Sequence, residues 1–240
     1  MPTTMQHGET SAPERGDISD ETLNRILRWV LIGLAGSIGL GGAIGGVRWA
    51  ASKLISPPPL TVVDVGFLQD MIDHHEQALV IAHAYLANNP NGQAAPYASE
   101  VILYQERDLK QMDRFLRDGN QNRGAPDRMA MTWMGAMEHA GMVMPSGGVP
   151  VSQMPGMQPL SRIQELEKLQ GKDAGRLFFQ LMTDHHKGGI EMALSASTTA
   201  SRKAIRDFAA YVVNGQRIEI VEYSQAVTRL GLSEDTTGPR

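Results

Sequence analysis

Residues 67–82 read FLQDMIDHHEQALVIA, and residues 178–193 read FFQLMTDHHKGGIEMA. Under a shift of 111 the two stretches match at seven of sixteen positions, including both His pairs. The same shift relates the polar residues of the segments that follow, which pair as Gln105 with Gln216 and Asp108 with Glu219. The sequence therefore contains one helical hairpin that is used twice.

Apolar residues recur at intervals of three and four in both stretches, which is the spacing of one face of a helix. The His pair lies in the middle of this apolar face in each copy. Because a single hairpin cannot cover such a face, we expect the two hairpins to pack together as an all-α, four-helix bundle. The bundle domain is predicted to span residues 61–231, with hairpins at 61–118 and 171–231, a connector at 119–170 and a C-terminal tail at 232–240.

The connector is rich in Gly, Pro, Asn and Met, and it holds eight of the 14 methionines. A short helix is expected from about Pro126 to Ala140, followed by an irregular segment that runs through Pro159. Because a loop has little core to fill, so many methionines indicate a flexible strap that binds a metal ion or a partner.

The N-terminal part of the chain has the pattern of a membrane anchor. Residues 29–47 contain no charged residue, and at about 1.5 Å per residue they reach roughly 28 Å, close to the thickness of a hydrocarbon core. The sequence therefore predicts one transmembrane helix at 29–50, after a mobile tail at 1–28 and before a Pro-rich spacer at 51–60. A cleaved signal peptide is the alternative.

Charges near this helix favour one orientation. Three arginines precede it, whereas one arginine and one lysine follow it closely. The positive-inside rule then places the N-terminus in the cytoplasm and the bundle outside it. Two overlapping Gly-x-x-x-Gly faces, Gly41 with Gly45 and Gly42 with Gly46, could pair such helices into a homo-oligomer.

The composition excludes several classes of protein. The chain has 240 residues, a formal net charge of −4 and no cysteine, so a disulfide framework, a Cys-ligated metal site and a thiol nucleophile are excluded. No cluster of Lys and Arg offers a face for nucleic acid, which is not expected as a partner. The Glu-x-x-His spacing of di-iron bundles and the His-Glu-x-x-His motif of zincins are both absent.

Methionine and histidine share a surface patch in each copy of the repeat. Met71 lies three residues before His74, and Met182 has the same relation to the second His pair. Thioether and imidazole form a soft donor set that suits Cu(I) and Ag(I). The predicted metal ligands are Met71, His74, His75, Met182, His185, His186 and Met192. The connector offers possible additional ligands in His139, Met137, Met142, Met144, Met154 and Met157.

Polar residues near these ligands could orient the imidazoles through hydrogen bonds. They are Asp73, Asp184, Gln105, Asp108, Gln216 and Glu219. Other interpretations stay open. The histidines and glutamines could instead hydrogen-bond one another and fix the register of the bundle, and the methionines could fill the core or grip a partner helix. A redox or hydrolytic metalloenzyme is a further alternative, although the sequence shows no proton-transfer group beyond the two aspartates that precede the His pairs.

A resemblance to a known family becomes specific at this point. The segments DMIDHHEQAL and LMTDHHKGGIEMA, each followed by a Gln-x-x-acid helix, resemble the two halves of the domain of unknown function 305 family. MPGM at 154–157 fits the same pattern, and the resemblance covers residues 61 to 230. It implies a ferritin-like helical bundle, commonly exported or membrane-anchored in bacteria, in a family with periplasmic members implicated in copper and silver binding. The predicted ligands match the family's motif positions, and the first half has Ile81 where the second has Met192.

These observations together predict a membrane-anchored, extracytoplasmic protein that binds copper as Cu(I) through Met and His. We expect a role in copper handling or tolerance rather than in catalysis. A structural or partner-binding module that uses the Met-rich connector, with no metal, is the alternative.

Overall fold

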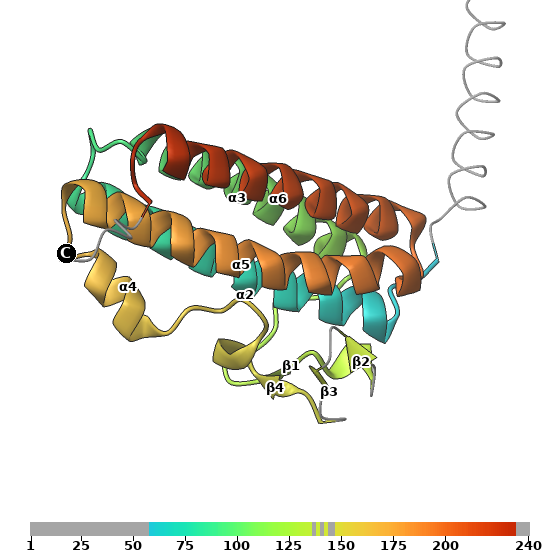
Figure 1. Ribbon diagram of the computed structural model, residues 1–240. Coiled ribbons are helices and arrows are strands. Elements are labelled where there is room, and N and C mark those ends of the chain that lie inside the picture. Colours follow the sequence, from blue (N-terminus) through green and yellow to red (C-terminus); the bar gives the residue numbers. More distant parts are fainter. Residues whose placement is uncertain (1–57, 136–137, 140–141, 144–146, 234–240) are drawn as a thin grey trace, which may run out of the picture. The chain divides into compact units, whose positions relative to one another are not determined.

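The computed structural model describes residues 58–135, 138–139, 142–143 and 147–233 of the chain. Four long helices dominate this part and are labelled in Figure 1. They are α2 (Val62–Asn88), α3 (Ala95–Asp118), α5 (Gly171–Thr199) and α6 (Lys203–Arg229), and a shorter helix, α4, covers Leu160–Leu166. The predicted all-helical architecture is confirmed for the described residues.

The predicted tail at 1–28 and transmembrane helix at 29–50 lie outside the described residues. So do positions 51–57 of the Pro-rich spacer and positions 234–240 of the C-terminal tail. Within the part that the structure describes, no helix is both long enough and apolar enough to cross a membrane. The membrane anchor therefore stays a prediction.

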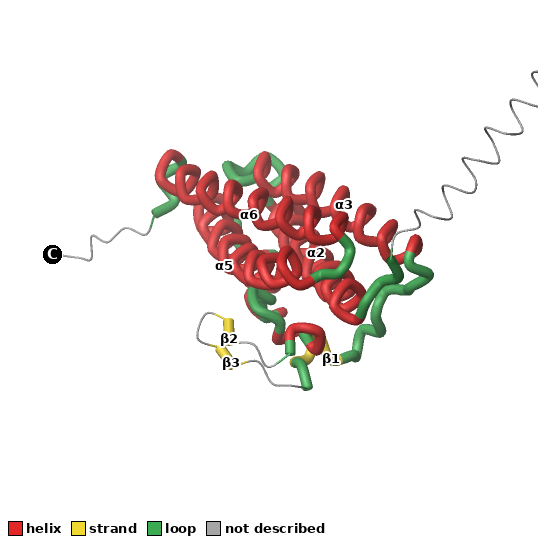
Figure 2. Tube along the Cα trace, turned by 90° about the vertical axis from the view of Figure 1, so that its right-hand side faces the viewer, coloured by secondary structure: helices red, strands yellow, loops and turns green. Residues whose placement is uncertain are grey.

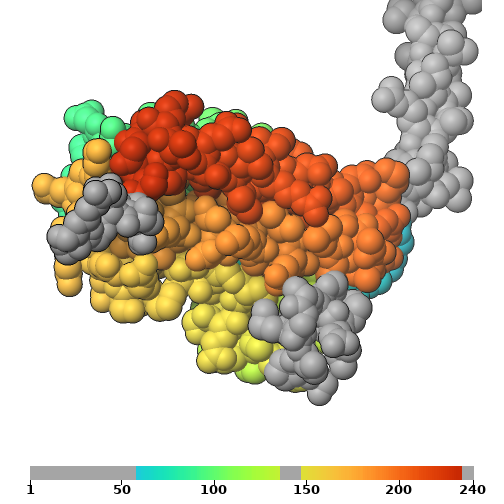
Figure 3. Space-filling view, in the orientation of Figure 1, coloured from blue at the N-terminus to red at the C-terminus, as the bar shows by residue number. Residues whose placement is uncertain are grey.

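The long helices form two hairpins that pack against each other. α2 packs against α3, α5 packs against α6, and α2 also lies along α5. Figures 1 and 2 show α3 and α6 side by side in one layer, α2 and α5 in a second layer, and the connector along the outer face of α2 and α5. The space-filling view shows the same order on one face, with α6 above α5 and the connector below them (Figure 3).

A reciprocal cap fixes the start of α2. Asp64 donates its backbone N–H to Thr61 Oγ1 at 3.3 Å, and Thr61 donates its own N–H to Asp64 Oδ2 at 2.8 Å. The other carboxylate oxygen of the buried Asp64 accepts the N–H of Ser201 at 2.8 Å and that of Arg202 at 3.2 Å. One side chain therefore joins the first turn of α2 to the loop between α5 and α6.

The apolar core divides into two clusters. The first, which we call the Trp133 cluster, includes Phe67, Met71, Met112, Trp133 and Met192. The second, the Tyr85 cluster, includes Ile81, Tyr85, Phe178, Met182 and Tyr223. Between them each long helix contributes two buried polar residues near its midpoint. These eight residues form the polar layer: His74, His75, Gln105, Asp108, His185, His186, Gln216 and Glu219.

The connector contains short strands and turns where a helix was expected. β1 (Met129–Ala130) pairs antiparallel with β4 (Val149–Pro150), and β2 (Glu138–His139) pairs antiparallel with β3 (Met142–Val143). The prediction of a helix from Pro126 to Ala140 is wrong. Met131 and Gly135 both have φ of 65°, a left-handed conformation that a right-handed helix cannot include.

The connector also contains two single turns of 3-10 helix, at Thr132–Met134 and Val151–Gln153. α4 starts directly after Pro159, in a segment for which no helix was predicted. Proline suits this position because it restricts the backbone before the first helical turn and has no N–H to leave unpaired.

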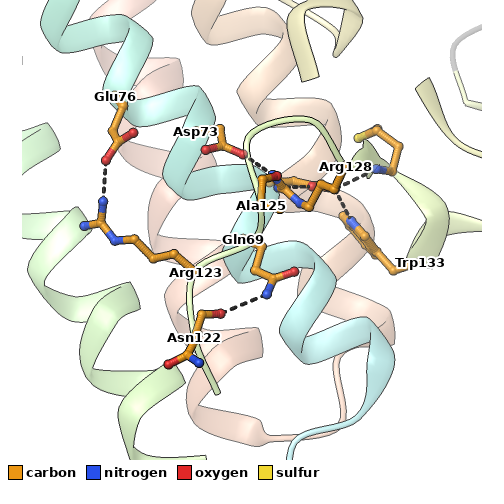
Figure 4. Close-up of polar contacts among 10 residues, drawn as sticks. Gln69, Asp73, Glu76, Asn122, Arg123, Ala125, Arg128 and Trp133 are labelled. Carbon is orange, nitrogen blue, oxygen red and sulfur yellow. Dashed lines mark hydrogen bonds and ion pairs between the residues drawn. The ribbon is translucent and has the colours of Figure 1, made fainter. Parts of the chain in front are cut away.

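One buried carboxylate fastens the connector to α2. Asp70 accepts hydrogen bonds from the N–H of Met131 at 2.7 Å, from Trp133 Nε1 at 2.7 Å and from Arg128 Nη2 at 2.6 Å. Arg128 also donates to Asp73, and Figure 4 shows this contact beside the indole of Trp133. Burial raises the pKa of Asp70 above its ordinary value, and the three donors oppose that shift.

Replacing Asp70 with alanine should lower the free energy of unfolding by about 3 kcal/mol, because it leaves two buried N–H groups without their acceptor and leaves the partly buried Arg128 with Asp73 as its remaining carboxylate. Urea denaturation followed by circular dichroism measures the change. Asp184→Ala is the matched control. Its exposed carboxylate pairs with the exposed Lys187, so its removal should change stability by less than about 0.5 kcal/mol. Equal effects of the two substitutions would contradict the role assigned to Asp70.

Candidate metal centre

Four fully buried histidine side chains meet at the centre of the bundle. The rings of His74 and His185 stack across the α2–α5 interface, with centroids 3.8 Å apart and an interplanar angle of 35°. His75 lies 6.4 Å from His74, and His186 lies 6.1 Å from His185, between ring centroids. The repeat explains this geometry, because two related helices that pack antiparallel at their midpoints bring the same motif together.

A glycine makes room for this packing. A Cβ atom on Gly189 of α5 would lie 2.5 Å from Oε1 of Gln216 and 3.0 Å from Cε1 of His74. Any larger residue would therefore push the amide of α6 or the imidazole of α2 away from the layer. The sequence signal for this position is the Gly-Gly step inside a helix, which was not among the predicted site residues.

The imidazoles have almost no hydrogen-bond partners. Nε2 of His186 lies 2.6 Å from Oε2 of Glu219 and 3.4 Å from the hydroxyl of Tyr223. The other seven ring nitrogens of the four histidines have no hydrogen-bond partner among the described residues. A buried polar atom without a partner costs about 1–3 kcal/mol, and native proteins keep few of them. Seven in one layer indicate a place that a ligand of the imidazoles would complete.

Burial also fixes the protonation of the central pair. It lowers the pKa of His74 and of His185 well below the ordinary value, and the neighbouring imidazoles lower both further. Both rings are therefore neutral at pH 7 and keep a free lone pair. A neutral imidazole is the form that binds a metal ion.

Two carboxylates and two amides border the imidazoles on the side of α3 and α6. Oδ2 of Asp108 lies 3.7 Å from Nε2 of His75, which repeats in looser form the contact of Glu219 with the second pair. Oε1 of Gln105 and both amide atoms of Gln216 have no hydrogen-bond partner in the described part of the chain. The four residues predicted on α3 and α6 to orient the imidazoles thus lie in the polar layer.

The two aspartates that precede the His pairs are placed elsewhere. Asp73 contacts Arg128, and Asp184 is exposed and accepts a hydrogen bond from Lys187 at 3.0 Å. Successive residues of a helix point about 100° apart, so when both histidines of a pair face the layer, the aspartate before them points about 200° away from the second histidine and is turned out of the layer. Neither aspartate is in position to orient an imidazole.

The predicted sulfur ligands flank the layer on both sides. Met71 and Met192 are fully buried in the Trp133 cluster, whereas Met182 is fully buried in the Tyr85 cluster together with Ile81. The antiparallel packing of α2 and α5 explains this, because a residue just before the His pair points toward opposite ends of the bundle in the two helices. Sequence spacing suggested two equivalent patches, and the structure instead gathers two of the three thioethers on one side.

The connector ligands fall into three groups. Met154 is buried in the Trp133 cluster, and Met157 packs against that cluster while partly exposed. His139 and Met142 belong to β2 and β3, where the structure describes the backbone alone. Met137 and Met144 lie outside the described residues.

Residues Met154–Gln158, which we call the strap, cover the layer on the side opposite α3 and α6. Gln77 of α2 holds the strap by two hydrogen bonds, from its Nε2 to the carbonyl of Gln158 at 3.0 Å and from the N–H of Gln158 to its Oε1 at 2.7 Å. Gly156, with φ of 82°, approaches α5 so closely that a Cβ there would lie 2.5 Å from the carbonyl oxygen of His185. The Pro155 carbonyl also lies near the ring of His74 and opposes the lowering of the His74 pKa, which burial dominates.

Replacing Gly188 with alanine should displace the strap, because the new Cβ would lie 2.1 Å from the carbonyl carbon and oxygen of Pro155. We expect a loss of about 1–3 kcal/mol in the free energy of unfolding and faster hydrogen exchange at the N–H of Gln158. Gly215→Ala in α6 is the control. A Cβ there meets nothing within 4 Å, and alanine should stabilise the helix by about 0.5–1 kcal/mol. Unchanged exchange at Gln158 in the Gly188 variant would contradict the close contact.

The fold and the layer define a class of protein: a helical bundle built from two repeats, with histidines buried at the midpoint of its helices. The chain belongs to the family described as Domain of unknown function (DUF305), whose model matches residues 64–227. The resemblance in the sequence is thereby confirmed.

Solved structures agree with this assignment. A DUF305 protein from Streptomyces coelicolor is 27% identical, with a TM-score of 0.59 over 70% of this chain and 94% of its own. A DUF305 fragment from Deinococcus radiodurans is also 27% identical, with a TM-score of 0.58 over 72% of this chain and 99% of its own. CopM in its Cu(II)-bound form is 21% identical, with a TM-score of 0.50 over 70% of this chain and 97% of CopM, and this likeness shows the fold alone. No curated protein matches the chain in sequence.

Proposed function

We propose that this protein binds Cu(I) at the polar layer and serves in copper handling or tolerance rather than in catalysis. The observation that carries this function is the set of seven imidazole nitrogens buried without a hydrogen-bond partner among the described residues. A metal ion that accepts the lone pair of one nitrogen in a ring would remove part of the cost of burying that ring.

The donor set fits copper better than harder ions. Among the described side chains, no three or more His, Asp or Glu residues are grouped so that they could hold an ion by themselves. Thioether sulfur would therefore complete the site, from Met71 and Met192 on one side or Met182 on the other. Neutral imidazole with thioether selects Cu(I), whereas Mg²⁺ and Ca²⁺ prefer oxygen ligands. His74, His75, His185 and His186 would supply the nitrogen ligands, with no more than two of them on one ion.

The structural neighbours support the same function. CopM, which shares the fold, was solved with Cu(II) bound, so a protein of this fold can hold copper. The Streptomyces coelicolor neighbour is described as a candidate secreted protein. This supports an extracytoplasmic position for the bundle. The proposal that residues 29–50 anchor it in the membrane rests on the uncharged run in the sequence.

Burial of three of the eight connector methionines weakens the alternative of a connector that binds a partner, although Met129 is 47% exposed. Met131, Met134 and Met154 are each about 2% exposed and belong to the Trp133 cluster of the protein's own core. A flexible methionine surface for a partner would instead expose its thioethers.

An anaerobic titration tests the proposed function. The full chain, purified in detergent, competes for Cu(I) with a chelator of known affinity, and Zn(II) is titrated in parallel. We expect tight Cu(I) binding, weaker Zn(II) binding, and both sulfur and nitrogen neighbours of copper in X-ray absorption spectra. Absence of Cu(I) binding, or copper bound by oxygen and nitrogen alone, would reject the function.

A further inference from the structure

The four imidazoles are fully buried, so an ion can reach them only where the protein opens. The strap closes the side of α2 and α5, where Gly156 and Gly188 bring two backbones into contact. The opposite side is different. A cleft of about 250 Å³ lies between α3 and α6, which Figures 1 and 2 show side by side in the outer layer.

The cleft reaches the imidazoles through their polar neighbours. Its lining includes Gln105 and Asp108 of α3 and the repeat-related Gln216 and Glu219 of α6. Each carboxylate therefore faces the cleft and also approaches one imidazole, at 3.7 Å for Asp108 and 2.6 Å for Glu219. Both are in position to pass a cation from water to a ring nitrogen.

Two amides in the lining lack the partners that buried polar groups normally have. Gln105 and Gln216 are each 3% exposed, and Oε1 of both has no hydrogen-bond partner in the described part of the chain. An amide oxygen carries a partial negative charge, so it can face a passing cation without being its final ligand. The cleft therefore offers four oxygen-bearing side chains along one short path.

The charges around the cleft also favour a cation. Besides Asp108 and Glu219, the lining contains Glu100 and Glu222, against the single cation Arg107. A cleft lined by one sign of charge concentrates the opposite ion and speeds its arrival.

Arg107 bridges the two helices at this cleft. Its guanidinium lies 5.1 Å from the ring centroid of Tyr104 on α3 and 5.1 Å from that of Tyr211 on α6. Its Nε also donates to Oδ1 of Asp108 at 3.3 Å. The Arg107 side chain thus spans the space between the helices. It also pairs with the Asp108 carboxylate, which an entering cation would meet.

We infer that the cleft between α3 and α6 is the route by which the cation enters and leaves the polar layer, with Arg107 as its gate. The inference rests on the copper binding proposed above. Asp108 and Glu219 pass the ion to His75 and His186, and Arg107 must leave Asp108 before the ion can pass. Arg107 is a positioning residue and not a ligand.

The rate of Cu(I) uptake tests the route. The full chain takes Cu(I) from a coloured chelator complex under anaerobic conditions, and a stopped-flow instrument follows the loss of colour. Arg107→Ala should speed both uptake and release by about tenfold and leave the equilibrium affinity unchanged. Lys110→Ala removes the same charge from an exposed residue of α3 paired with Glu106, so it controls for the general electrostatic effect. Asp108→Asn combined with Glu219→Gln should slow uptake by about tenfold or more.

A second readout needs no metal. Diethyl pyrocarbonate modifies accessible neutral imidazoles, and mass spectrometry locates the label. In the metal-free Arg107→Ala protein, labelling of His75 and His186 should rise severalfold over wild type, with the exposed His83 as internal reference. Labelling that stays at the wild-type level would contradict the gate.

The outcomes separate the two proposals. Wild-type protein that binds no Cu(I) would reject the function and the route with it. Normal equilibrium binding with equal uptake rates in the Arg107 and Lys110 variants would reject the route alone. Faster uptake in Gly188→Ala, with no change in Arg107→Ala, would show instead that the ion enters beneath the strap.

Discussion

Replacing His74 and His185 together with leucine is expected to weaken Cu(I) binding by on the order of 1000-fold or more and to make the metal-free protein more stable. Removing a group that only orients a metal ligand costs about 10–100-fold in affinity, so removing two ligands should cost more. The gain in stability has a separate cause. Both rings are fully buried and none of their four nitrogens has a hydrogen-bond partner within the described chain. Leucine has a similar volume and no polar atom to satisfy, so the free energy of unfolding should rise by about 1–3 kcal/mol.

Chelator competition and urea denaturation of the same preparations measure the two effects. His83→Leu is the control, because it removes an exposed histidine from the same helix, α2. It should leave the copper affinity unchanged and alter stability by less than about 0.5 kcal/mol. Unchanged affinity in the double variant would show that His74 and His185 are not the copper ligands. A loss of stability would show that the imidazoles hold the bundle together, as in the interpretation in which they fix its register.

The sequence allowed the two hairpins to be predicted because one motif recurs at a fixed shift. The shift also linked Gln105 with Gln216 and Asp108 with Glu219, and all four lie in the polar layer. Helical periodicity was sufficient to predict that these residues are buried. It could not give the antiparallel packing of α2 and α5, which puts Met182 on one side of the layer and Met71 on the other.

The parts that could not be predicted depend on backbone conformation and long-range contacts. The connector leaves the helical conformation at Met131, a residue type that rarely adopts positive φ, and Asp70 of α2 accepts its N–H. Sequence alone does not show that a carboxylate sixty-one residues earlier determines this turn. The close approach of Gly156 to Gly188 could not be predicted either, because the sequence does not show that these two glycines meet.

The metal-free protein should lose stability steeply as the pH falls below about 6.5, the ordinary pKa of a histidine. Burial holds the pKa of His74 and His185 well below that value in the folded state, with the neighbouring imidazoles as the second cause. The unfolded chain therefore binds two more protons than the folded one as the pH falls, and these protons stabilise the unfolded state. The full stability is present above pH 6.5 and is lost as the pH falls toward the lowered pKa values. Each residue contributes a slope of about 1.4 kcal/mol per pH unit, so the pair contributes about 2.7.

Other titrating groups act in a different range. The pKa of Asp113 is lowered by its hydrogen bonds from Arg123, and the pKa of Asp70 is raised by burial, so these carboxylates affect stability in opposite directions around their ordinary value of 3.8. The first loss below pH 6.5 is therefore that of the stacked histidines. Urea denaturation between pH 7.5 and 5, with a chelator present to keep metal out, measures the slope.

The His74→Leu and His185→Leu double variant should show a nearly flat profile over this range, whereas His83→Leu should keep the wild-type slope. A wild-type slope below about 1 kcal/mol per pH unit would mean that the folded protein accepts protons on the stacked rings. Such protons would have to be balanced by Asp108 and Glu219, the carboxylates nearest to the two outer imidazoles. The layer would then be a network of charged pairs without free lone pairs. The acid profile therefore tests, without any metal, whether the central imidazoles are in the form that Cu(I) requires.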